Sequence, residues 1–224
     1  MNHLKAIIFD MDGVITMTMP LHYRAWVRVF ASIEIKVSRF EVYRREGQKG
    51  LDSVIEISAQ YGKPVTVAVA KELLLKKERL FKRAVRTRFV PGARNFIKRC
   101  HQSGLKTGLV TGTARHEVEK ILPAALIKSF DAIVCGSDVR NGKPHPEPYL
   151  KALKALKVTG GEAVVIENAP FGITSAVKAG VTCVAIETSL PAIYLKEADH
   201  VIRNYGELIA LFKQLYYPAS IKRL

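Results

Sequence analysis

The sequence predicts an α/β fold, in which a doubly wound, Rossmann-like parallel sheet core carries an inserted all-helical cap domain. An apolar, strand-like run, Lys5–Phe9, opens the chain. Residues 16–88 have helical periodicity, and from Pro91 onward strands alternate with helices. Such alternation is typical of a parallel sheet covered on both faces. We therefore expect a core domain formed by residues 1–15 and 89–224, and a helical cap formed by residues 16–88.

The cap segment should contain four helices. These are 20–33, 38–44, 51–61 and a long basic helix that begins after Thr66. Ser38 and Thr66 are favourable N-cap residues, because a hydroxyl oxygen there can accept a hydrogen bond from a backbone N–H. A single buried stripe is expected along the long helix, formed by Val67, Ala70, Leu74, Phe81 and Val85.

The second half should supply five more strands. The expected strands are 105–110, 130–135, 163–167, 181–186 and 200–202. Helices are expected at 92–103, from about 114, at 147–157 and at 170–179, and a short segment at 192–198 precedes the last strand. In open parallel sheets, ligands bind beyond the carboxyl ends of the strands. The residues that follow each strand are therefore candidates for a functional site.

The composition is that of a globular protein. The chain has 224 residues, of which 48% are hydrophobic, enough for a substantial core. It has no run of roughly eighteen apolar residues and no signal-type N-terminus, so we expect a cytoplasmic protein with no membrane partner. The three cysteines, Cys100, Cys135 and Cys183, are widely spaced and indicate buried thiols rather than disulfides or a zinc site.

The net charge of +15 favours anionic partners, such as phosphorylated metabolites or nucleic acid. Much of it lies on the long helix, where a solvated face is the simpler interpretation of Lys71, Lys76, Lys77, Arg79, Lys82, Arg83, Arg86 and Arg88. A nucleic-acid-binding surface would interleave these charges with stacking aromatic residues, and only Phe81 and Phe89 lie near them. Nucleic-acid binding is therefore the least favoured function, and the oligomeric state stays open.

Two carboxylates, Asp10 and Asp12, follow the first strand. They can share one cleft, because side chains two residues apart in an extended chain point the same way, and Gly13 then permits a turn. Carboxylates this close repel each other unless a cation, a proton or hydrogen-bond donors offset the charge. The pair fits a nucleophile, an acid–base partner and a metal, but it fits an ordinary turn equally well.

Three further strand ends carry residues suited to phosphate chemistry. Thr111 and Gly112 could hold phosphate oxygens with helix N-terminal amides, although Thr113 alone would make an ordinary cap. Lys143 lies in a Gly-Lys-Pro loop that could aim its ammonium at a fixed point.

An acid and an amide, Glu167 and Asn168, follow the strand that begins at residue 163. Mg²⁺ prefers hard oxygen ligands, which Asp10, Glu167 and Asn168 could supply. An acid pair, a threonine, a lysine and an acid thus stand in this order at four strand ends. Together they favour phosphoryl transfer.

These motifs resemble those of the haloacid dehalogenase superfamily, specifically its phosphatase and β-phosphoglucomutase-like branch, over nearly the whole chain. The family's DxDG motif corresponds to residues 10–13, its threonine motif to Thr111, its lysine motif to Lys143 and its acidic motif to residues 167–168. The resemblance implies a magnesium-dependent phosphatase for a small phosphorylated metabolite, such as a sugar phosphate or a phosphoglycolate-like compound. It also implies that the helical segment is a cap.

The resemblance implies a role for each motif residue. Asp10 would be the nucleophile that forms an aspartyl-phosphate, and Asp12 the acid that protonates the leaving group and then the base that activates water. The phosphoryl oxygens would be held by Thr111, Gly112 and Lys143, and the metal by Asp10, the main-chain carbonyl of Asp12, Glu167 and Asn168.

Asn168 departs from the family pattern, because many relatives have an aspartate there. The amide keeps an oxygen for the metal or its waters but removes one negative charge. We therefore expect weaker magnesium binding than in an Asn168→Asp variant.

Three cap residues are candidate substrate contacts. His22, in a His-x-x-Ala-Trp stretch similar to that of β-phosphoglucomutase-like proteins, would face the cleft, although a structural role within its helix fits as well; Trp26 is expected in the cap core. Arg45 and Lys49 lie in a loop that carries specificity residues in relatives, and either could bind a second anionic group. A mutase needs such a cation, whereas a phosphatase needs only a competent water. We favour the phosphatase and keep the sugar-phosphate mutase as the alternative.

Overall fold

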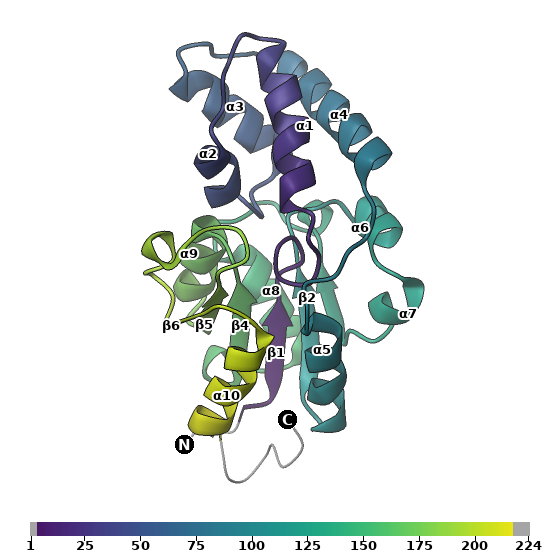
Figure 1. Cartoon of the computed structure of the whole chain (residues 1–224), viewed down its shortest axis with the longest axis vertical. Coiled ribbons are helices and arrows are strands. Elements are labelled where there is room, and N and C mark those ends of the chain that lie inside the picture. The colour runs from purple at the N-terminus through teal and green to yellow at the C-terminus, as the bar shows by residue number, and fades with distance from the viewer. Residues whose placement is uncertain (1–3, 217–224) are drawn as a thin grey trace.

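In the computed structural model, which describes residues 4–216, six parallel strands form one sheet in the order β3-β2-β1-β4-β5-β6 (Figure 1). The strands are β1 (Ala6–Phe9), β2 (Lys106–Val110), β3 (Ala132–Val134), β4 (Ala163–Glu167), β5 (Thr182–Ile186) and β6 (His200–Ile202). The first strand lies in the middle, between β2 and β4. This is the doubly wound, Rossmann-like α/β fold that the sequence predicts.

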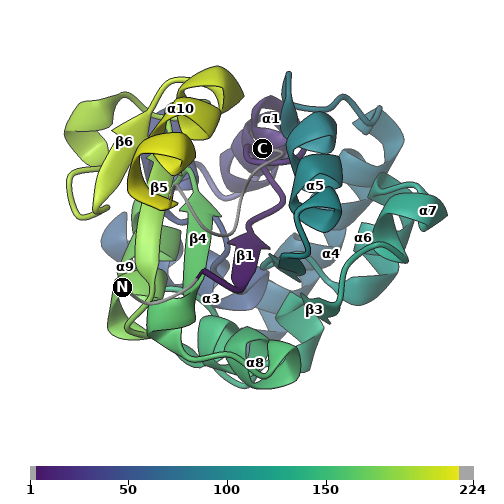
Figure 2. The same ribbon diagram turned by 90° about the horizontal axis from the view of Figure 1, so that it is seen from below.

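Helices cover both faces of the sheet (Figure 2). One face packs against α8 (Glu147–Leu156) and α9 (Pro170–Lys178), and the other against α5 (Ala93–Gln102) and α10 (Tyr205–Tyr216). Every residue of β1 is buried, because alternate side chains enter the two cores. Neither α10 nor the short α7 (Ala124–Ile127) was predicted from the sequence, whereas α6 (Arg115–Ile121) begins within a residue of its predicted start.

Four helices lie between β1 and α5 and contact one another. They are α1 (Met19–Ala31), α2 (Arg39–Arg44), α3 (Gly50–Gln60) and α4 (Val67–Ala84), and they are called here the helical unit. Ser38 accepts a hydrogen bond from the backbone N–H of Glu41, and Thr66 accepts one from that of Val69, which confirms both predicted N-caps. In Figure 1 the helical unit stands over the carboxyl ends of the strands.

The chain enters and leaves the helical unit through two paired segments. Thr16 bridges to Phe89, and the Met17 N–H donates to the carbonyl of Arg88 at 2.8 Å. The two crossings therefore lie side by side, as a hinge requires. The division of the chain into domains at 16–88 stays a prediction, and this pairing occurs close to both proposed boundaries.

The buried stripe of α4 differs from the predicted one. Its buried members are Ala70, Leu73, Lys77 and Phe81, whereas Val67 is 54% exposed because it lies in the first turn, before the helix becomes covered. Lys77 was expected on a solvated face and is instead buried. The helix therefore directs one cation inward.

Within the part of the chain that the structure describes, no helix has both the length and the apolar character that a membrane span requires.

Candidate active site

The four predicted strand ends converge around one lysine. The Lys143 ammonium, which lies in the loop after β3, donates to Asp10 Oδ1 at 2.7 Å and to Glu167 Oε1 at 2.6 Å. It also donates to the main-chain carbonyl of Val110, the last residue of β2, at 3.3 Å. All three charged side chains are at most 1% exposed. The parallel topology accounts for this convergence, because the ends of β1, β2 and β4 are neighbours at one edge.

Both carboxylate oxygens of Glu167 accept hydrogen bonds. Oε1 accepts from Lys143 and from the Tyr149 hydroxyl at 2.7 Å, and Oε2 accepts from the Asn168 N–H at 2.9 Å. In this arrangement Glu167 positions Lys143, and its predicted role as a metal ligand stays a prediction. Tyr149 belongs to no motif and was not predicted from the sequence, because only the packing of α8 brings it to the site.

The surroundings of Asp10 disfavour the charged form of its carboxyl group. Burial raises its pKa, the Lys143 charge lowers it, and the charges of Glu167 and Asp12 raise it again, which leaves the pKa at about 8. Its second oxygen, Oδ2, has no hydrogen-bond partner. With Lys143 already beside it, Asp10 becomes an effective anion near neutral pH only when a further cation lowers its pKa.

Asn168 offers a second oxygen of the same kind. Of the four buried side-chain polar atoms without a partner in residues 4–216, two are Asp10 Oδ2 and Asn168 Oδ1. The side-chain N–H of Asn168 donates to Ser189 Oγ at 2.6 Å. This bond is consistent with the positions of the nitrogen and oxygen atoms of the Asn168 amide. Unpaired buried oxygens cost free energy, and a hard cation such as Mg²⁺ would satisfy both. The donor set therefore fits Mg²⁺, although no group of three His, Cys, Asp or Glu side chains that could hold a metal occurs in the same residues.

Asp12 is held by donors from both parts of the molecule. Its Oδ1 accepts from the Thr18 hydroxyl and lies 3.2 Å from His22 Nε2, and its Oδ2 accepts from Thr113 at 3.0 Å and Thr111 at 3.4 Å. Burial raises its pKa, but His22 and the hydroxyl donors lower it to about 2. Asp12 is thus a carboxylate in this arrangement. No sequence signal pointed to Thr18, and Thr113 was expected only as a cap.

His22 lies at the site on the helical unit, where it neighbours Asp12 and lines the cavity, and its predicted contact with the leaving group stays a prediction. Its ring stacks on Phe81 with 4.0 Å between the ring centres. Burial and the nearby Lys77 charge lower its pKa, more than contact with Asp12 raises it. The imidazole is therefore neutral at pH 7. At that pH it acts on Asp12 through a hydrogen bond and not through a charge.

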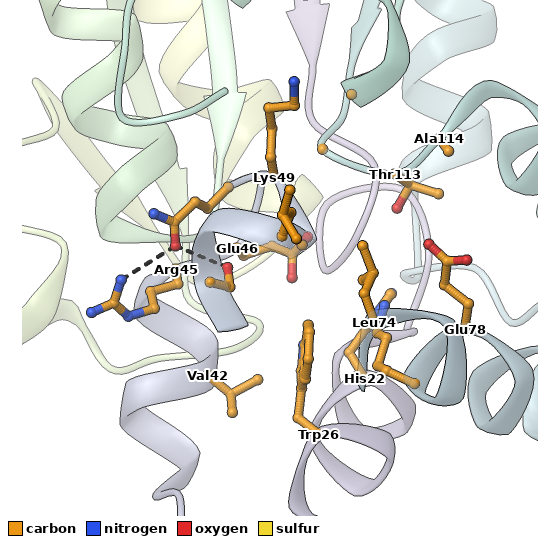
Figure 3. Close-up of a pocket in the computed structure, with 18 of the residues that line it drawn as sticks. His22, Trp26, Val42, Arg45, Glu46, Lys49, Leu74, Glu78, Thr113 and Ala114 are labelled. Carbon is orange, nitrogen blue, oxygen red and sulfur yellow. Dashed lines mark hydrogen bonds between the residues drawn. The ribbon is translucent and has the colours of Figure 1, made fainter. Parts of the chain in front are cut away.

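A cavity of about 240 Å³ lies between the helical unit and the core (Figure 3). Its walls include His22 and Thr113, two of the four side-chain partners of Asp12, together with Trp26 and the loop between α2 and α3. Asp10 does not line it and is fully buried. Access to Asp10 therefore requires the loop to move.

Two glycines let that loop reach the core. A Cβ atom on Gly112 would lie 2.6 Å from the carbonyl carbon of Gly47, and one on Gly47 would overlap the side chain of Lys143. Gly47 also has a φ of 80°, which disfavours any other residue. Gly112 is thus needed here for close approach of the loop, while its predicted contact with phosphate stays a prediction.

Arg45 and Lys49, the two predicted substrate-binding cations of the loop, bond to other groups of the protein. Arg45 donates to Glu41 at 2.7 Å and pairs with Glu56, all within the helical unit. Lys49 donates to the main-chain carbonyls of Val139 and Arg140, each at 3.3 Å. Both side chains nevertheless line the cavity, and the predicted substrate contact of each stays a prediction.

Comparison with known proteins agrees with this geometry. A family model for haloacid dehalogenase-like hydrolases matches residues 4–180. The chain is 30% identical to the β-phosphoglucomutase of Bacillus subtilis over 212 residues, 92% of each chain. It is 33% identical to a Thermotoga maritima protein named phosphorylated carbohydrates phosphatase over 185 residues, 80% of this chain and 82% of that one.

A solved structure from Bacteroides vulgatus, named provisionally as a β-phosphoglucomutase, superposes with a TM-score of 0.83 at 31% identity, over 99% of this chain and 91% of that one. The chain also spans 19% of the longer protein SUPPRESSOR OF QUENCHING 1, chloroplastic, from Arabidopsis thaliana, at 33% identity over 87% of its own length.

The fold and the lysine-centred site define a hydrolase of the α/β class. The chain belongs to the haloacid dehalogenase-like hydrolases, and its relatives include enzymes named as phosphatases and as β-phosphoglucomutases. This confirms the resemblance drawn from the four motifs.

Proposed function

We propose that the protein is a magnesium-dependent phosphatase that hydrolyses a small phosphorylated metabolite, a sugar phosphate or a phosphoglycolate-like compound, through an aspartyl-phosphate. The observation that carries the proposal is the buried Asp10 carboxylate, with one oxygen on the Lys143 ammonium and the other unpartnered. A group in this position can attack phosphorus once its charge is offset.

In the proposed reaction, Asp10 Oδ2 forms a bond to phosphorus as the bond to the leaving oxygen breaks. Asp12, which must be protonated when the substrate binds, gives its proton to that oxygen. In the second half Asp12 takes a proton from water, whose oxygen bonds to phosphorus as the bond between phosphorus and Asp10 Oδ2 breaks, so that inorganic phosphate is released and Asp10 is restored. Because Asp12 now accepts from Thr18 and Thr113, it must leave at least one hydroxyl to carry this proton.

Lys143 and Thr111 would hold the phosphoryl oxygens, with the Gly112 amide beside them. Asp10, the Asp12 carbonyl and Asn168 would hold Mg²⁺, with Glu167 nearby. When bound, the metal would neutralise charge between a carboxylate and a phosphate that otherwise repel each other. The segment 16–88 would act as a cap, since Asp10 is inaccessible while Gly47 contacts Lys143.

A mutase of the β-phosphoglucomutase type remains the second candidate, because a relative of that name matches 92% of the chain. A phosphatase is favoured because Arg45 and Lys49, the loop cations that could grip a second phosphate, are already bonded elsewhere.

The deciding experiment is a screen of phosphate release from sugar phosphates and phosphoglycolate, with and without Mg²⁺. Asp10→Asn should lower the rate on the order of 10³-fold or more, because it removes the nucleophile. Release that is unaffected by Asp10→Asn would refute the mechanism. Isomerisation of glucose 1-phosphate with no phosphate release would establish the mutase instead.

A further inference from the structure

A second cavity, of about 150 Å³, lies between α4 of the helical unit and α6 of the core, and it is called here the side cavity. It lies outside the proposed active site, because none of the motif residues lines it. It adjoins the active-site cavity, since Glu78 of α4 and Glu117 of α6 line both. In Figure 1 the two helices are drawn at the side of the molecule where the chain returns from the helical unit to the core.

The floor of the side cavity is apolar. Phe81 and Ile121 line it and are each 2% exposed, and Val85 beside them is half-buried. Leu75 lies at its mouth and is exposed. An apolar cavity of roughly 150 Å³ in a protein is large enough to hold benzene. The side cavity therefore accommodates an apolar body about the size of one aromatic ring.

Cations surround this floor on the solvent side. Arg79 and Lys82 of α4 and Lys120 of α6 all line the side cavity and are exposed. None of the ion pairs in residues 4–216 includes any of them, whereas Arg115, at the start of α6, pairs with Asp138. The sequence analysis interpreted Arg79 and Lys82 as part of a solvated face. The structure places them beside one apolar floor, together with a cation of the core.

Two acids oppose these three cations. Glu78 and Glu117 are half-buried at the border with the active-site cavity, so positive charges still outnumber negative ones when both acids are ionised. Burial raises the pKa of Glu117, the Lys77 charge lowers it, and the Glu78 charge raises it again, which leaves the pKa above its usual value. The small excess of positive charge suits a monoanion, such as a carboxylate. A phosphate dianion would meet stronger repulsion from the two acids.

The floor also connects the side cavity to the active site. Phe81 stacks on His22 with 4.0 Å between the ring centres, and His22 Nε2 lies 3.2 Å from Asp12 Oδ1. A molecule seated on Phe81 between α4 and α6 would touch both the helical unit and the core. Because such a molecule fits this arrangement of the two parts, its binding favours this arrangement over any in which they separate.

We propose that the side cavity is a second binding site, for a small monoanion with an apolar body, of the arylcarboxylate class. The apolar floor would hold the ring, and Arg79, Lys82 and Lys120 would attract the carboxylate. The site is independent of the proposed function. Its effect on catalysis rests on that function, since the occupant would oppose the movement that gives access to Asp10.

The first test compares benzoate, benzyl alcohol and benzylamine, which share a ring and differ in charge. In NMR titrations at low ionic strength, benzoate should bind about fivefold or more tightly than benzylamine, as expected for exposed charges. Benzoate should also shift the methyl resonances of Leu75, Val85 and Ile121. Equal or tighter binding of benzylamine, or shifts confined to methyl groups elsewhere, would overturn the proposal.

Two pairs of variants test the ring and the charge separately. Leu75→Trp fills the mouth and should abolish the binding of benzoate, while Val69→Trp, at another exposed position of α4, should retain it. Lys120→Gln should weaken the binding about twofold or more. Lys128→Gln removes an exposed cation outside the side cavity and should leave it unchanged. Equal binding within both pairs would overturn the proposal, and because all four positions are exposed the variants should fold.

The effect on catalysis is measured with the same ligand. Saturating benzoate should lower kcat/KM of the wild-type protein about threefold or more, and it should have no effect on Leu75→Trp. Equal inhibition of Leu75→Trp would show that benzoate acts at another site, and no inhibition of the wild type would overturn the coupling to the active site. Absence of all hydrolysis would reject the phosphatase, while the binding data would still decide whether the side cavity is a site.

Discussion

The two sides of the active-site cleft are built differently. On the core side, Asp10, Glu167 and Lys143 form a closed network in which one cation is shared by two buried acids. On the cap side, Arg45 bonds to Glu41 and Lys49 bonds to a main-chain carbonyl, while Glu46 lines the cavity. Under the proposed function, the core side would hold the phosphate and the helical unit would contact the group attached to it.

The core network predicts the largest loss of stability. Burial lowers the pKa of Lys143, but Asp10 and Glu167 raise it more, so the ammonium stays charged. Lys143→Met would leave two buried acids without a cation and should reduce the free energy of unfolding by about 3–5 kcal/mol, together with loss of activity. Urea denaturation measures the change.

Lys49→Met is the matched control on the cap side. Lys49 donates only to two main-chain carbonyls at 3.3 Å, so the loss should stay below about 1 kcal/mol. Equal losses in the two variants would show that the core network is no more tightly coupled than the cap contact.

The contact between the two sides predicts the next largest effect. Gly112→Ala places a Cβ 2.6 Å from the Gly47 carbonyl carbon and should hold the loop away from the core. A displacement of this size should lower kcat/KM roughly 100-fold, because positioning of reacting groups is sensitive to about 1 Å. Steady-state kinetics measures it.

Gly62→Ala separates this effect from backbone strain. Gly62 has a φ of 70° and open space around it, so the variant should lose about 1 kcal/mol of stability and no activity. If Gly112→Ala retained full kcat/KM, close approach of the loop would not matter for catalysis.

The same contrast explains what could be predicted from the sequence. Asp10, Thr111 and Lys143 follow strands of a parallel sheet, and Glu167 ends one. The topology alone brings these strand ends together. The orientation of Arg45 could not be predicted, because it depends on tertiary packing against acids of α2 and α3.

Residues without a motif were missed for a related reason. Thr18 and Tyr149 reach the site only through the placement of their helices, and the inward direction of Lys77 depends on which turn of α4 is covered. Short-range patterns identify elements and strand ends, whereas these contacts depend on how elements pack.

The proposed metal ligand Asn168 predicts a smaller effect, a change in the affinity for Mg²⁺. Asn168→Asp adds a negative charge at the unpartnered oxygen and should tighten Mg²⁺ binding roughly threefold to tenfold, since ligand charge tunes the affinity of such sites. Calorimetric titration with Mg²⁺ measures it directly. Asn95→Asp makes the same change on an exposed position of α5 and should have no effect. Unchanged or weaker binding in Asn168→Asp would contradict the proposed ligand set.

The smallest effect concerns the loop that carries Lys143. Glu147 accepts hydrogen bonds from the backbone N–H groups of Arg140 and Asn141, each at 2.8 Å, and these donors lower its pKa to about 2. Since the folded-state pKa is depressed, Glu147 stabilises the fold above pH 4.5, and this contribution is lost as the pH falls toward 2. Glu147→Gln should therefore be less stable than wild type above pH 4.5 and equal to it near pH 2.

Glu162→Gln supplies the comparison for that loop. The pKa of Glu162 is also lowered to about 2, by Lys5 and Thr159, but it precedes β4 at the amino end of the strand, on the edge opposite the site. Both variants should flatten the acid limb of the stability profile, measured by thermal melting between pH 2 and pH 7. Only Glu147→Gln should also lower kcat/KM, by a few-fold, because it alone loosens the loop that aims Lys143. An equal kinetic loss in Glu162→Gln would mean that general destabilisation, and not the position of Lys143, limits the rate.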